Sequence, residues 1–73
     1  KGAMVVTPKG QIRAAALLHY FCTPAGCADN ARLALFYRQP ADADGLAMRA
    51  LIGWGRSVNN GETPPMAKRR LTP

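Results

Sequence analysis

The order of hydrophobic and polar residues predicts three helices in the middle of the chain. From about Pro8 to Phe21, the residues beyond the first turn are apolar on nearly every side, interrupted only by Arg13 and His19. A helix that is hydrophobic all round is a buried one, so this segment is expected at the centre of the fold. Thr7 followed by Pro8 is typical of a helix start, with an N-cap and then proline at the first helical position.

A second helix is expected from about Cys27 to Arg38. The segment before it, residues 22–26, contains Pro24 and Gly26 and is predicted to be a turn, because the residue before a proline avoids the helical region and glycine tolerates positive φ. Gln39 and Pro40 would end the second helix.

A third helix, from about Gly45 to Arg56, has the clearest amphipathic pattern of the three. One broad face is apolar, and Arg49 and Arg56 lie together on the opposite face. Gly53 and Gly55 weaken the last turn of this helix. The apolar face consists of Ala47, Met48, Leu51, Ile52 and Trp54.

The two ends of the chain differ from this helical body. Residues 4–7 form a short β-branched stretch that is able to add to the edge of another sheet, while residues 1–3 resemble the remnant of a cleaved expression tag. Residues 59–73 bury little and end in a basic tail that is expected to be mobile. The fold class is therefore predicted to be mainly α: an extended arm over 1–7, a three-helix domain over 8–58 and a flexible basic tail.

Composition places the chain among small, strongly basic domains. It has 73 residues, 48% of them hydrophobic, and ten Lys and Arg against four Asp and Glu, for a net charge of +6. Such a charge favours nucleic acid, an anionic membrane or an acidic protein surface as partner. Because no apolar run approaches a membrane span and no signal peptide is present, a cytoplasmic protein without a membrane partner is expected.

Cys22 and Cys27 are the main candidates for site chemistry. A disulfide between them is sterically conceivable, but a cytosolic compartment keeps thiols reduced, so two free, buried cysteines are expected. Together with His19 they offer three zinc ligands, one fewer than a structural site needs. A Cys–His nucleophile would lack an orienting carboxylate and a cleft. We therefore expect no metal, no cofactor and no enzymatic activity.

The charged residues leave several binding interpretations open. Three short helices are compatible with a helix-turn-helix DNA-binding repressor or plasmid regulator, although Arg49 and Arg56 suit phosphates better than base edges. A solvated cationic face is an equally good interpretation of those two arginines. The basic residues 68–70 suit phosphates, an acidic protein groove or simple solubility. An antitoxin whose tail folds on its partner is a further alternative.

The chain as a whole resembles small phage-encoded transcription inhibitors and antiterminators that bind host RNA polymerase. The likeness lies in size, charge, a high Ala, Arg, Gly and Pro content, and an arm over residues 4–13 that leads into a small body. It implies a monomer in the host cytoplasm that binds the polymerase β′ amino-terminal region and the β flap near the RNA exit channel. Such binding would displace σ factor and suppress termination, and nascent RNA or DNA would lie within reach.

The resemblance also implies two groups of contact residues on this chain. The anchor to the polymerase would be Val5, Val6, Lys9, Ile12 and Arg13. The second contact, to an acidic surface or to nucleic acid, would be Arg49, Arg56, Lys68, Arg69 and Arg70.

Overall fold

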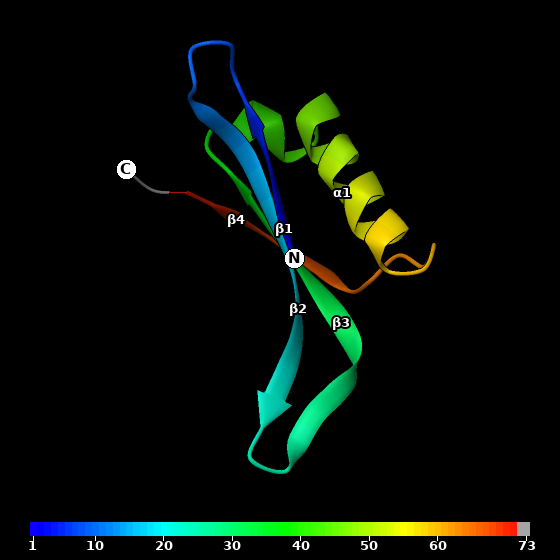
Figure 1. Ribbon diagram of the computed structural model, residues 1–73. Helices are drawn as coiled ribbons and strands as arrows, with labels where there is room; N and C mark the ends of the chain where they lie inside the picture. The colour runs from blue at the N-terminus through cyan, green and yellow to red at the C-terminus, as the bar shows by residue number, and fades with distance from the viewer. Residues whose placement is uncertain (72–73) are drawn as a thin grey trace.

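The computed structural model describes residues 1–71, without the side chains of Phe21 and residues 28–30, and it shows a mixed β-sheet covered on one face by a helix (Figure 1). The strand order is β1-β2-β3-β4, with β1 and β3 antiparallel to β2 and β4 parallel to β3. The prediction of a mainly α, three-helix domain is therefore wrong. The elements are β1 (Gly2–Val6), β2 (Ile12–Thr23), β3 (Gly26–Tyr37), the short 3₁₀ helix η1 (Pro40–Ala43), α1 (Leu46–Val58) and β4 (Met66–Arg70).

The two central strands replace the first two predicted helices. In a strand, successive side chains point to opposite faces, so the apolar run of β2 supplies both faces of the sheet. Ala14, Ala16 and Leu18 are buried on the face toward α1, which we call the inner face, whereas Ala15 and Leu17 lie on the opposite, outer face. The same sequence that suits a helix buried all round thus forms a strand that is apolar on both sides.

The first predicted helix start is a hairpin turn between β1 and β2. The Thr7 N–H donates to the Gln11 carbonyl at 2.8 Å, and the Gln11 N–H donates back to the Thr7 hydroxyl at 3.1 Å. Gly10 adopts a φ of 85°, which closes the turn at no steric cost. The Thr–Pro pair therefore ends a strand here, using the same side-chain acceptor that would have capped a helix.

The predicted turn between residues 22 and 26 is confirmed, but it joins two strands. Pro24 and Ala25 form the turn, and Gly26 has a φ of 132°. Cys22 and Cys27 face each other across the hairpin with their Cα atoms 3.9 Å apart and form a disulfide. The prediction of two free, buried cysteines is wrong, because hairpin pairing places the two residues directly opposite each other and both are exposed.

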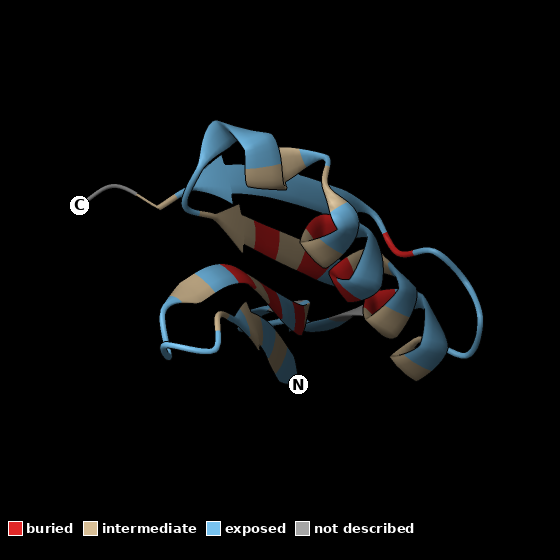
Figure 2. Ribbon diagram, turned by 90° about the horizontal axis from the view of Figure 1, so that it is seen from above, coloured by how far each residue is buried: buried red, intermediate tan, exposed pale blue. Residues whose placement is uncertain are grey.

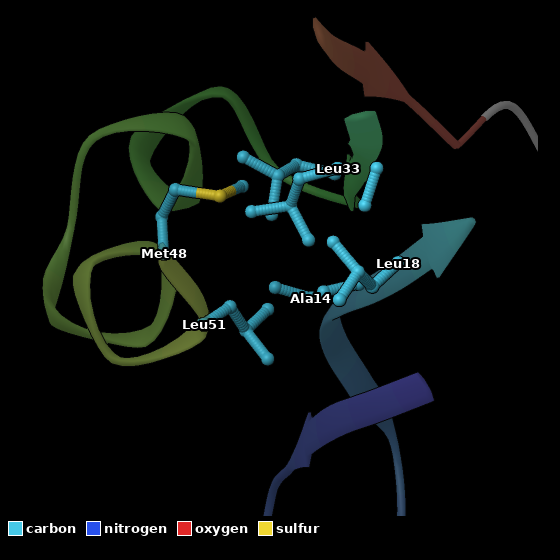
Figure 3. Close-up of a cluster of buried hydrophobic side chains, with 8 residues drawn as sticks. Ala14, Leu18, Leu33, Met48 and Leu51 are labelled. Atoms are coloured by element: carbon cyan, nitrogen blue, oxygen red, sulfur yellow. The ribbon is translucent and has the colours of Figure 1, made fainter. Parts of the chain in front are cut away.

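The third predicted helix is confirmed as α1 and supplies the other half of the core. Met48 and Leu51 project from α1 onto Ala14, Leu18 and Leu33 of the two central strands (Figure 3). Gly55, which was expected to weaken the helix, is buried against β3: a Cβ at this position would lie 2.7 Å from a Leu33 methyl group. The glycine lets helix and sheet approach closely.

Both ends of the chain belong to the sheet as its two outer strands. β1 starts at Gly2, so residues first interpreted as a tag remnant take part in the pairing with β2. β4 pairs with β3, and the flexible tail predicted for residues 59–73 is wrong over Met66–Arg70, while Thr72 and Pro73 lie outside the described residues. Buried residues concentrate between sheet and helix, and β4 is exposed throughout (Figure 2).

Candidate functional site

The outer face of the sheet is the surface that α1 leaves uncovered. α1 packs on the inner face of β1, β2 and β3. On the outer face, strand register sets side chains in rows: Phe36 lies between Ala15 of β2 and Arg69 of β4, and Arg32 lies beside His19. Large apolar groups stay accessible there, with Leu17 47% exposed.

Part of the outer face is hollowed into a groove of about 410 Å³ across β2, β3 and β4. Small side chains form its floor, because Ala34 and Ala67 are register partners between the two rows of larger residues. Phe36 and Arg69 line one side, and His19 and Arg32 line the other. Alternation along the strands, and not any local motif, thus builds a hollow with an aromatic ring and cationic groups around it.

Among the described residues, the charged side chains that line the groove are arginines. None of the described residues that line it is acidic. Asp44 forms an ion pair with Lys68, with 3.0 Å between Oδ1 and Nζ. Asp42 forms one with Arg13, with 3.8 Å between Oδ1 and Nε. Both carboxylates belong to the segment that leads into α1.

The second exposed feature is the outer edge of β1. Lys1 and Leu18 bond each other in both directions: the Leu18 N–H donates to the Lys1 carbonyl at 2.8 Å, and the Lys1 amino group donates to the Leu18 carbonyl at 3.2 Å. In an antiparallel pair the direction of the backbone groups then alternates, so those of Gly2 and Met4 point away from β2. The exposed side chains of Met4 and Val6 flank this edge.

The predicted anchor residues are spread over this hairpin in different environments. Val6 and Lys9 are exposed, and Arg13 is exposed beside Asp42. Val5 packs against the hydrophobic core, and Ile12 is half-buried. The structure therefore brings the five residues onto one hairpin but leaves only part of the set accessible to a partner.

The second predicted group of basic residues does not form one surface. Arg49 and Arg56 are exposed on α1, and the Arg56 Nε donates to the Gly61 carbonyl at 2.8 Å, which ties the loop after the helix. In β4, Lys68 turns toward the helix side and Arg69 toward the groove. The Arg70 Nε lies 3.4 Å from the Arg38 carbonyl, which it contacts as a donor. Only Arg69 of the five lines the groove.

The outer face also contains residues that sequence reasoning missed. Arg32 and Phe36 were placed on a helix, and neither was expected to contact a partner. The available signal was the period-two pattern over residues 31–38, in which Leu33 and Leu35 alternate with these two residues. That pattern sits next to a hairpin turn and predicts a strand with one apolar and one mixed face.

Three of the alternative interpretations, a cysteine nucleophile, a zinc site and a helix-turn-helix, lose their structural basis. The disulfide uses both sulfur atoms, so neither Cys22 nor Cys27 is a thiolate ligand or nucleophile in this state. Across the described residues no cluster of three or more His, Cys, Asp or Glu side chains suits a metal ion. A helix-turn-helix needs two packed helices, whereas residues 1–71 contain α1 as their single α-helix.

Comparisons with known proteins found no match: no family model, curated protein or solved structure matches the chain. Within residues 1–71, no helix has the length and apolar character needed to cross a bilayer.

Proposed function

We propose that the protein is a non-enzymatic regulator that binds bacterial RNA polymerase through the open edge of β1 and thereby inhibits initiation and suppresses termination. The single observation that carries this proposal is the edge itself: β1 is an outer strand, and the backbone groups of Gly2 and Met4 point away from the sheet. An edge of this kind pairs with an extended segment of another protein by main-chain hydrogen bonds.

The side chains around the edge suit such a contact. Met4 is 61% exposed and Val6 is 50% exposed, so two apolar groups accompany the backbone donors and acceptors. Lys9, at the tip of the adjoining turn, adds a positive charge that favours an acidic partner surface. By contrast, Val5 contributes to folding, since it packs against the core.

The choice of RNA polymerase rests on the whole-chain resemblance to phage proteins of this class. That resemblance assigns the β′ amino-terminal region and the β flap as the surfaces bound, with σ displacement and antitermination as the consequences. An extended segment in either surface would supply the strand that the β1 edge lacks on its open side.

A substitution at Met4 separates main-chain pairing from side-chain contact. Met4→Pro removes an N–H that points outward, so the pairing of β1 with β2 keeps its hydrogen bonds while a partner strand loses one. Met4→Ala removes the side chain and keeps that N–H. We expect Met4→Pro to abolish most binding to purified core polymerase and most inhibition of transcription, and Met4→Ala to lower affinity only several-fold.

The measurement is polymerase affinity by biolayer interferometry, with circular dichroism to check that each variant keeps the wild-type fold. Equal binding by folded Met4→Pro and wild-type protein would remove edge pairing from the proposal. Absence of binding to polymerase by the wild-type protein would remove the partner as well.

A further inference from the structure

The groove on the outer face has a composition that the edge of β1 does not explain. Phe36 and Arg69 line one side, His19 and Arg32 line the other, and a row of alanines separates them. On β3, Arg32 and Phe36 are four residues apart, which corresponds to about 13 Å along a strand. We propose that this groove binds single-stranded nucleic acid, with a base against the Phe36 ring and phosphates against the arginines.

The first argument for this ligand is the aromatic ring over a floor of small residues. A nucleobase is a flat apolar group, and stacking on an aromatic side chain accepts any base because every base has a π face. Ala34 and Ala67 leave the space above the sheet that a base requires, and Phe36 is half-buried at its border. A four-stranded sheet with an accessible aromatic residue on its open face is a surface that RNA-binding domains also use.

The second argument is the sign of the surrounding charge. Arg32 and Arg69 line the groove, and no described lining residue is acidic. Guanidinium groups bind phosphate oxygens in two-point contacts and also stack on bases. A ligand that carries a phosphate for every base therefore matches both the ring and the cations.

The third argument is that single strands fit and duplexes do not. A duplex hides the faces of its bases, so only its phosphates would reach the arginines. An acidic protein segment would also place carboxylates beside the arginines but would leave Phe36 without a stacking partner. Single-stranded RNA and single-stranded DNA share the required chemistry, and the 2′-hydroxyl distinguishes them.

The test is fluorescence polarisation of a short labelled oligouridylate with the purified chain. The competitors are the corresponding single-stranded deoxyoligonucleotide, a duplex and polyglutamate. Arg69→Ala and Arg49→Ala form a matched pair, because each removes one exposed arginine and only Arg69 lines the groove. Phe36→Leu removes the ring and keeps an apolar side chain. Circular dichroism checks the fold of all three variants.

The proposal expects Arg69→Ala to weaken binding about fivefold. It also expects this variant to lower the salt slope, which is the steepness with which log K falls as log salt concentration rises, by about one. Phe36→Leu should weaken binding by a similar factor without changing the salt slope, and Arg49→Ala should stay within about twofold of wild type. The groove is supported as the site if RNA binds more tightly than single-stranded DNA, and equally if the two bind with the same affinity.

Three results would overturn the proposal: no binding of any single strand at low salt, equal losses for Arg49→Ala and Arg69→Ala, or displacement by duplex or polyglutamate as effectively as by a single strand. If Phe36→Leu does not fold, the two arginine variants decide the question alone. Since no polymerase is present in this experiment, its outcome is independent of the function proposed above.

Discussion

The two faces of the sheet are built from the same strands and differ in what covers them. On the inner face, Leu33 and Leu35 are almost fully buried under α1, and Met48 of α1 is buried against the sheet. On the outer face, Leu17 stays 47% exposed, and the groove beside it is lined by aromatic and cationic groups. The inner face therefore accounts for most of the hydrophobic stabilisation, and the outer face is available for binding.

This difference shows how strand alternation divides the residues of a small chain between the core and the uncovered surface. Adjacent positions along one strand are about 3.3 Å apart yet serve opposite faces, so Leu35 stabilises the core while its neighbour Phe36 borders the groove. A single helix supplies one cover only. The outer face of the sheet is thus left without a cover of its own.

The largest expected contrast between the faces is in stability. Leu35→Ala removes a fully buried side chain from the inner face and should lower the free energy of unfolding by about 2–5 kcal/mol. Leu17→Ala, the matched change on the outer face, should lower it by about 1 kcal/mol or less. Urea unfolding followed by circular dichroism measures both, and equal losses would contradict the division between faces.

A second contrast concerns the hairpin tip, where neither face has a cover. The β2–β3 hairpin extends past the end of α1 (Figure 1), and the Cys22–Cys27 disulfide crosses it there. Replacing both cysteines by serine should lower the free energy of unfolding by about 2 kcal/mol, the estimate for so short a closed loop. A reductant should lower the wild-type urea midpoint and leave that of the double variant unchanged. No effect of the reductant on either chain would show that the disulfide does not stabilise the tip.

The smallest contrast lies within α1 and separates its sheet side from its solvent side. Gly55→Ala should lower the free energy of unfolding by about 1–2 kcal/mol, because the added Cβ meets Leu33 and overpacking outweighs the gain in helix propensity. Gly53→Ala should raise it by about 0.5–1 kcal/mol, since no atom beyond its chain neighbours and the local helix backbone lies within 4 Å of the added Cβ. Thermal unfolding of the two variants checks the opposite signs, and a gain for Gly55→Ala would place the helix farther from the sheet.

Part of this architecture was predictable from the sequence. The α1 segment has a polar and an apolar side at helical spacing, so its existence and approximate bounds followed from the pattern alone. Ala14 to Leu18 gave no such information, because a strand that is apolar on both faces reads like a buried helix. The better signal was the pair of cysteines flanking Pro24, which predicts a hairpin once strand pairing is considered.

The candidate site was harder to predict than the fold. Arg69 was selected for its charge, but its neighbours in the tail were selected equally, and only strand alternation separates it from Lys68. Phe36 and His19 line opposite sides of the groove from different strands, and no linear motif joins them. Their placement around one groove depends on register, which a single sequence specifies only after the strands are known.

The most direct test of the central claim is a residue-by-residue map of where a single-stranded oligonucleotide binds the isotope-labelled chain, obtained from amide chemical-shift changes in solution. The division between faces predicts that the shifts concentrate at His19, Arg32, Phe36 and Arg69 and that the amides of Arg49 and Arg56 stay in place. Shifts centred on the exposed side of α1 would contradict it.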